Sequence, residues 1–224
     1  TMKQAFHIIT STCVPLPLEN IDTDQIIPAR FMKATTRDEQ FFGEHLFHDW
    51  RYLDDGRPNP NFVLNQPQYS GEILVAGKNF GSGSSREHAA WAIAGYGFRV
   101  VVSSYFADIH KNNELNNFVL PVVVSESFLQ TLFQCIQENP ATQVEVNLPE
   151  QRISNLANGQ SEHFDINAFK KHCLMAFDAI KNKPADGQVL ILKSWNEWGE
   201  GNYMEPDLKF GKGFIHALRD ALNE

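Results

Sequence analysis

Residues 79–89 read Asn79-Phe80-Gly81-Ser82-Gly83-Ser84-Ser85-Arg86-Glu87-His88-Ala89. They follow the apolar run Ile73–Ala76 and precede a segment of helical character, so a strand, a tight turn and a helix are expected here. The two glycines allow backbone N–H groups to converge at the start of the helix, where anions bind. The turn adds two adjacent hydroxyls and a guanidinium, which suit a ligand that carries a carboxylate. The stretch therefore predicts an anion site with the groups for chemistry.

A purely structural interpretation of the same turn is open. Turns rich in Gly and Ser often join a strand to a helix, and Ser84 or Ser85 can act as a helix cap. Glu87 then only favours the helix dipole. The spacing argues against a nucleotide loop, because no third glycine stands at the dinucleotide position and no Gly-Lys-Ser/Thr follows. Residue types alone leave a structural turn and an anion site as alternatives.

Composition narrows the class of protein. With 224 residues and 42% hydrophobic content, the chain is expected to be a soluble globular protein of one or two domains. A net charge of −8 predicts no nucleic-acid partner. The sequence shows no run that could span a membrane and no signal peptide, so we expect a cytoplasmic protein. The three cysteines, Cys13, Cys135 and Cys173, form no CxxC pair, and no metal or cluster site is predicted on this chain.

Strand and helix patterns alternate around the turn. Strands are expected within residues 2–18 and over 72–76, 98–103, 119–124 and 143–148, and helices over 86–96 and 105–115. A further helix is expected to begin after Ser125 or Ser127 and to end at Glu138, and another to begin at Ala168, capped by Asn167. Residues 31–70 look like an irregular loop, and long loops are usually functional. The pattern predicts an α/β protein with a sheet of mixed direction.

Two further motifs precede the turn, Asp22-Thr23-Asp24-Gln25-Ile26-Ile27-Pro28 and Phe47-x-Asp49-Trp50-Arg51-Tyr52. In this order the three motifs resemble the family of 3-isopropylmalate dehydratase (isopropylmalate isomerase) small subunits, which are relatives of aconitase. Shorter matches are Phe62-Val63-Leu64-Asn65, Tyr96-Gly97-Phe98-Arg99, Phe106-Ala107-Asp108-Ile109 and Lys171-His172-Cys173-Leu174-Met175. The resemblance covers roughly residues 2–175. It implies the aconitase-type swivelling β/β/α domain.

The resemblance also implies a function. Enzymes of this family interconvert 2-isopropylmalate and 3-isopropylmalate in leucine biosynthesis, by dehydration and rehydration through isopropylmaleate. The small subunit is active only as a heteromer with a large subunit. The [4Fe–4S] cluster is expected on that large subunit, which explains why no cluster ligands occur in this chain. The substrate expected for this chain is therefore isopropylmalate, and no cofactor is expected to bind to the chain itself.

Site residues follow by similarity. Ser84 corresponds to the catalytic base of aconitase, which acts as an alkoxide, and Ser85 and Arg86 correspond to residues that hold a substrate carboxylate. Such an alkoxide needs backbone N–H groups, Arg86 and the partner's cluster close by. Asp24 and His88 are supporting candidates. Each of these residues also has a purely structural interpretation. Arg86 could form a surface salt bridge, Asp24 could form a turn, and His88 could be a hydrogen-bonded polar group without a role in catalysis.

Arg37 is a further candidate for substrate binding. It matches an arginine in the substrate-recognition loop of the bacterial family, where it would bind the second carboxylate. A solvated loop arginine is the alternative interpretation.

One residue departs from the family pattern before the strand near residue 120. Phe118 stands where the family has glycine. If that position has a positive φ, the phenylalanine costs on the order of 1 kcal/mol.

The tail after Met175 departs from the family altogether. Residues 190–207 resemble the C-terminal end of WbsX-like putative glycosyltransferases, which are related to the barrels of glycoside hydrolase family 99. There, Glu197 and Glu200 correspond to catalytic carboxylates, which suit glycosidic chemistry. A barrel needs about 250 residues and draws its site from several strands, so a joined gene fragment or chimera is expected instead. The predicted domains are residues 1–175 and an atypical C-terminal extension, residues 176–224.

Three functions compete at this point. The first is the dehydratase subunit, and the second is a carbohydrate-active protein that depends on Glu197 and Glu200 alone. The third is a non-catalytic anion-binding or scaffold module, in which the turn binds without reacting.

Overall fold

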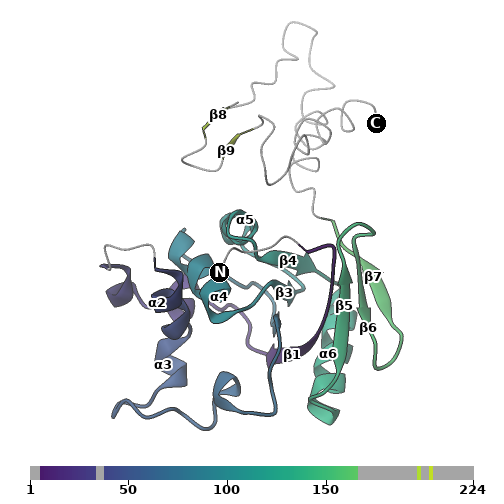
Figure 1. The fold of residues 1–224 in the computed structure, drawn as a ribbon, viewed down its shortest axis with the longest axis horizontal. Coiled ribbons are helices and arrows are strands. Elements are labelled where there is room, and N and C mark those ends of the chain that lie inside the picture. The colour runs from purple at the N-terminus through teal and green to yellow at the C-terminus, as the bar shows by residue number, and fades with distance from the viewer. Residues whose placement is uncertain (1–5, 34–37, 166–195, 198–201, 204–224) are drawn as a thin grey trace, which may run out of the picture. The chain divides into compact units, whose positions relative to one another are not determined.

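The computed structural model describes residues 6–33, 38–165, 196–197 and 202–203 (Figure 1). The chain divides into two compact units, residues 1–164 and residues 165–224, and each is considered by itself. The described part of the second unit is a short antiparallel pair, β8 (Asn196–Glu197) and β9 (Asn202–Tyr203). The predicted domain boundary after Met175 and the helix predicted from Ala168 lie outside the described residues.

A seven-stranded sheet forms the frame of the first unit, with the order β4-β3-β2-β1-β5-β6-β7. Strand β1 (Ile8–Leu16) pairs in parallel with β2 and in antiparallel fashion with β5, so it joins two halves of opposite character. The parallel half holds β2 (Ile73–Ala76), β3 (Val100–Ser103) and β4 (Leu120–Val123). The antiparallel half holds β5 (Gln143–Asn147), β6 (Arg152–Asn155) and β7 (Ser161–His163). The predicted α/β class with a mixed sheet is confirmed.

The longer helices agree with the sequence pattern. They are α4 (Glu87–Tyr96), α5 (Asp108–Asn116) and α6 (Glu126–Glu138). Of the two candidate caps for α6, the structure has Ser125, whose hydroxyl accepts the N–H of Phe128 at 3.1 Å. Helix α5 begins three residues later than predicted because the preceding segment is bound to the turn. The N–H of Phe80 donates to Tyr105 and the N–H of Ala107 donates to Phe80.

Residues 31–70 are more regular than the sequence predicted. They contain α2 (Glu39–Glu44), α3 (His48–Arg51) and the 3-10 helix Val63–Asn65, and the 3-10 helix Ala29–Lys33 leads into them. Helices of three to six residues are too short to form alone, and they show no clear period in the sequence. Tertiary contacts stabilise them instead. The ring of Phe47 stacks on that of Trp50, and Phe42 is fully buried.

The core lies on both faces of the parallel half. Every residue of β2 and β3 is buried, as expected for parallel strands that are covered on each side. On one side α2 crosses α4 at close range, and Figure 1 shows these two helices together. A Cβ atom on Gly43 or Gly95 would overlap the backbone of the other helix. This crossing fixes α4, and so places the turn that precedes it.

Phe118 ends α5 in the left-handed region, with φ of 61°. This is the conformation for which a glycine is preferred, so the departure from the family pattern has the predicted backbone cost. We expect Phe118→Gly to raise the free energy of unfolding by about 1 kcal/mol, because glycine adopts positive φ without the clash of a Cβ atom. Urea unfolding followed by circular dichroism measures the change. Phe118→Ala is the control: it keeps the Cβ atom and is expected to give no gain. A loss of stability in Phe118→Gly would contradict the prediction.

Candidate active site

The turn after β2 is bound to the segment that precedes α1 (Thr23–Ile26). The N–H groups of Gly81 and Ser82 donate to the carbonyl of Ile21 at 2.8 and 3.1 Å, and the N–H of Thr23 donates to Ser82 at 2.9 Å. Asp22 caps α1 and forms a full capping box with Gln25. Two of the motifs that carry the family resemblance therefore meet at one point of the fold.

Ser84 and Ser85 are exposed on the turn, and neither hydroxyl caps a helix. The N-cap residue of α4 is Arg86, and the helix start has no side-chain cap hydrogen bond. Thr23, which is buried, donates from Oγ1 to the carbonyl of Ser84 at 2.8 Å and so anchors the turn. Within the described residues, the N–H groups of Gly83, Ser84 and Ser85 donate no hydrogen bond. Free amides at a helix N-terminus are the arrangement that binds an anion.

Arg86 and Asp24 form an ion pair across the turn, through Nη1 and a carboxylate oxygen. The Arg86 side chain is 17% exposed and that of Asp24 is 55% exposed. The hydrogen bond from Arg86 is the main reason that the pKa of Asp24 lies below its ordinary value. Asp24 thus orients the guanidinium and stays ionised at neutral pH. The pair joins a residue of α1 to the start of α4.

His88 lies one residue into α4. Its ring packs against Phe42 and Trp91, with centroid distances of 5.3 and 4.6 Å. Burial is the main cause that lowers its pKa, which favours the neutral imidazole. His88 does not line the pocket described below, so its supporting role stays a prediction.

Three other candidates do not belong to the part of the first unit described here. Arg37 and Glu200 lie outside the described residues. Glu197 belongs to β8 of the second unit. Their predicted roles stay predictions.

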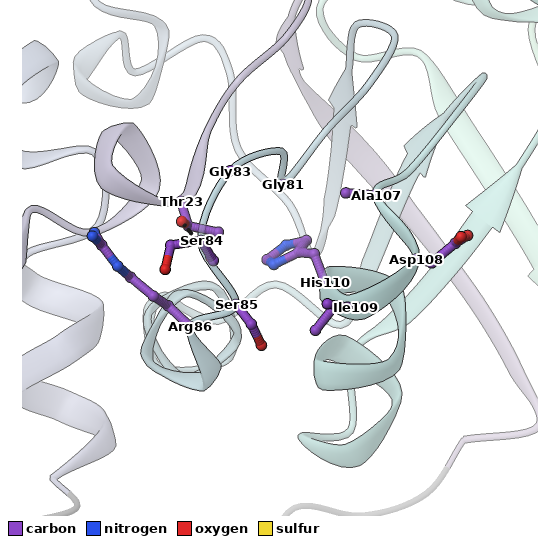
Figure 2. A pocket seen from close by; sticks show the side chains of 10 residues that line it. All are labelled: Thr23, Gly81, Gly83, Ser84, Ser85, Arg86, Ala107, Asp108, Ile109 and His110. Carbon is purple, nitrogen blue, oxygen red and sulfur yellow. Dashed lines mark hydrogen bonds between the residues drawn. The ribbon is translucent and has the colours of Figure 1, made fainter.

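A pocket of about 260 Å³ opens beside the turn. Its lining comes from α1, the turn and the start of α5: Thr23, Gly81, Gly83, Ser84, Ser85, Arg86, Ala107, Asp108, Ile109 and His110 (Figure 2). Three of the four residues predicted to act on the substrate, Ser84, Ser85 and Arg86, therefore line one cavity. The arrangement offers an anionic ligand free amides, two hydroxyls and a guanidinium, and it places a potential proton acceptor beside them.

The contribution of α5 to this pocket was not predicted. His110 is buried in the wall, and its Nε2 lies 3.0 Å from Oε1 of Glu114 one turn further along the helix. The signal in the sequence is the spacing of His110 and Glu114, which lie four residues apart and therefore on the same face of a helix.

The described part of the chain holds no cluster of His, Cys, Asp and Glu residues that could bind a metal ion. Burial raises the pKa of the Cys13 thiol to about 12, which favours the neutral thiol at neutral pH. None of the helices in the described ranges is long and apolar enough to cross a membrane.

Three family models match the chain. The model described as "Aconitase C-terminal domain" matches residues 3–127, and "LeuD_N" matches residues 130–168. The model described as "Glycosyltransferase WbsX" matches residues 154–218, which agrees with the resemblance seen in the tail. The first match covers more than half of the chain, and the third only a minor part.

Curated relatives and a solved structure support the same family. The 3-isopropylmalate dehydratase small subunit of Azobacteroides pseudotrichonymphae is 58% identical over 179 residues, which are 79% of this chain and 90% of that protein. The small subunit of Cytophaga hutchinsonii is 58% identical over 172 residues, or 77% and 85% of the two chains. The crystal structure of 3-isopropylmalate dehydratase (leuD) from Methanocaldococcus jannaschii has a TM-score of 0.53 and 25% identity, and covers 75% of this chain and 89% of that chain.

Proposed function

This chain belongs to the family of 3-isopropylmalate dehydratase small subunits, and we propose that its turn supplies the base and a carboxylate-binding group of the reaction. The family activity is that of a hydro-lyase in leucine biosynthesis, which interconverts 2-isopropylmalate and 3-isopropylmalate through isopropylmaleate. It is exerted together with a large subunit. The proposal concerns which residues of this chain take part.

Ser84 is the proposed base. Dehydration removes a proton from the carbon next to a carboxylate, while the hydroxyl leaves the neighbouring carbon. The proton passes to Oγ of Ser84, which must carry negative charge to accept it. The free N–H groups of Gly83, Ser84 and Ser85 and the N-terminus of α4 favour that charge. The single observation that carries the proposal is that an uncommitted, exposed serine hydroxyl stands among these free amides in one pocket with Arg86.

Arg86 and Ser85 are the proposed carboxylate ligands. The guanidinium already binds one carboxylate, that of Asp24, and it lines the same pocket as Ser84. A substrate carboxylate that lies beside Asp24 receives the remaining donors of the guanidinium, since arginine has five. Arg37 is proposed to bind the second carboxylate, by its match to the family motif alone.

The described residues include two free cysteines, Cys13 and Cys135. An iron–sulfur cluster needs several cysteine thiolates. Cys13 is buried with a raised pKa, and Cys135 lies on α6, away from the pocket lining. We infer that the large subunit holds the [4Fe–4S] cluster, which would act on the leaving hydroxyl. The exposure of Ser84 and Ser85 supports a site that is completed by that second chain.

The proposal is tested on the assembled enzyme. The chain is co-expressed with a large subunit, and the cluster is loaded without oxygen. We expect the complex to form isopropylmaleate from 3-isopropylmalate, followed by the ultraviolet absorbance of the new double bond, and each subunit alone to be inactive. Citrate, which lacks the isopropyl group, is the control substrate and is expected to give no turnover. An assembled and loaded complex without activity towards isopropylmalate would refute the proposal.

The carbohydrate-active alternative is supported by the WbsX match in the tail alone. It depends on Glu197 and Glu200, and the described residues include only the first of them. The family match in the tail covers 154–218, far less than a barrel.

A further inference from the structure

We propose that His110 and Glu114 form a buried charged pair that supports the base at Ser84 from beneath the turn, as positioning residues that act through charge. This inference deepens the proposed function and rests on it. It assigns a role to two residues of α5 that do not belong to the motifs described above.

His110 is packed directly against the turn. Its ring lies so close to Gly81 that a Cβ atom there would overlap the Cγ and Cδ2 atoms of the imidazole. Gly81 has φ of 75°, so both its backbone and its neighbour require glycine. The ring also meets Phe80 edge to face, with 5.4 Å between centroids. Figure 2 shows the imidazole beneath the turn, between the start of α5 and Ser84.

Glu114 lies one helical turn beyond His110 on α5 and contacts its imidazole. His110 lines the pocket and Glu114 does not, although Nε2 and Oε1 are 3.0 Å apart. The Glu114 side chain is fully buried and that of His110 is 2% exposed. Burial raises the pKa of Glu114, and the adjacent imidazole opposes that rise.

The polar atoms of the pair are not satisfied by the fold. The ion-pair contact is short, but its atoms are not aligned as a hydrogen bond, and Nδ1 of His110 has no hydrogen-bond partner within the described part of the chain. Buried polar atoms in this condition cost free energy. Replacement of a buried ion pair by apolar residues of similar volume is often neutral or stabilising. Stability alone therefore does not explain this pair, whereas a function at the pocket does.

The position of His110 between Glu114 and the turn determines which charge lies next to the active site. We place the proton on the imidazole, so that the positive charge lies against the turn and the negative charge lies one helical turn further along α5. A positive charge next to Gly81 favours negative charge on Ser84 and on a carboxylate bound by the free amides. Other charges near this place are Arg86, already paired with Asp24, and Asp108 and Lys111 on α5. Because the charge on Ser84 matters most during proton transfer, the pair is expected to act on kcat more than on KM.

The first test removes the charges and keeps the shape. The double variant His110→Phe/Glu114→Leu is assembled with the large subunit and assayed with 3-isopropylmalate. We expect kcat to fall roughly 10- to 100-fold, the range for groups that support an active-site residue, and KM to change less than about threefold. The melting temperature is expected to be unchanged or higher. An unchanged kcat would overturn the inference, because a packing role survives this replacement.

A second variant covers the case in which the double variant does not fold. Glu114→Gln keeps the volume and a hydrogen-bond acceptor for the imidazole, and it is expected to lower kcat about tenfold. Glu138→Gln, at the exposed end of α6, is the matched control and keeps full activity. Full kcat in Glu114→Gln would also overturn the inference. Failure of the proposed function gives a different result, because the wild-type complex itself would then be inactive towards isopropylmalate.

Discussion

Ser84→Ala is expected to lower kcat of the assembled enzyme by roughly 10³-fold, within the range that a positioned general base contributes. The hydroxyl of Ser84 is exposed in the pocket and caps no helix, so its loss leaves no structural hydrogen bond unmade. Its backbone carbonyl still accepts the hydroxyl of Thr23 at 2.8 Å, which holds the turn in place. The variant should therefore fold and assemble as the wild type does. The effect falls on proton removal and not on the binding of isopropylmalate.

The measurement is a comparison of kcat and KM, with gel filtration and the melting temperature to establish that the complex is intact. Ser161→Ala, an exposed serine of β7, is the matched control and should retain full activity. Retained turnover in Ser84→Ala would refute the assignment of the base. The family membership would be unaffected, and the base would then have to be sought elsewhere, on Ser85 or on the large subunit.

Arg86→Lys is expected to raise KM for isopropylmalate by roughly 10- to 100-fold, the worth of about 1.5–3 kcal/mol for hydrogen bonds to a charged group. Lysine keeps the positive charge but loses the planar fork that can serve two carboxylates at once. In the wild type that fork binds Asp24 from within the chain, so one ammonium group would have to serve both Asp24 and the substrate. A charge-conserving change should thus be far from neutral.

Steady-state kinetics over a wide range of isopropylmalate concentrations measures this effect. Arg152→Lys is the matched control, because Arg152 forms an exposed ion pair with Glu150 at 2.8 Å on the antiparallel half of the sheet. Surface pairs of this kind contribute little, so the control should show unchanged KM. An Arg86→Lys enzyme with wild-type KM would show that the guanidinium serves only to hold Asp24.

Local sequence pattern was enough to predict most of the frame. The strand, the turn and the helix around residues 79–89 were predicted from an apolar run, two glycines and helical spacing, and the structure has β2 and α4 there. The pattern failed where elements were short or polar. Strands β6 and β7 have four and three residues, β6 has one apolar residue, Ile153, and β7 has none, so neither shows a clear apolar–polar alternation in the sequence. They form by pairing in succession, β6 with the edge of β5 and β7 with the edge of β6.

The site was predicted in part. Ser84, Ser85 and Arg86 were identified from their turn and the family motif, and they do line one pocket. The motif did not predict which residues from other parts of the chain contact them. Asp24 is 62 residues from Arg86 in the chain and Thr23 is 61 residues from Ser84. His110 was missed, since a histidine in a helix carries no sign of which side chain or turn it will face.

The sequence by itself determined the class of fold, the turn and the family, because strand and helix periods and turn chemistry act over a few neighbouring residues. Only the tertiary structure decided that Asp24 pairs with Arg86 and that Thr23 anchors Ser84. Only the tertiary structure placed the buried pair of α5 under Gly81. These contacts depend on how β1, β2 and β3 align in parallel, since that alignment brings the ends of distant segments to one place. Long-range contacts of this kind are properties of the whole packed chain, which no local stretch encodes.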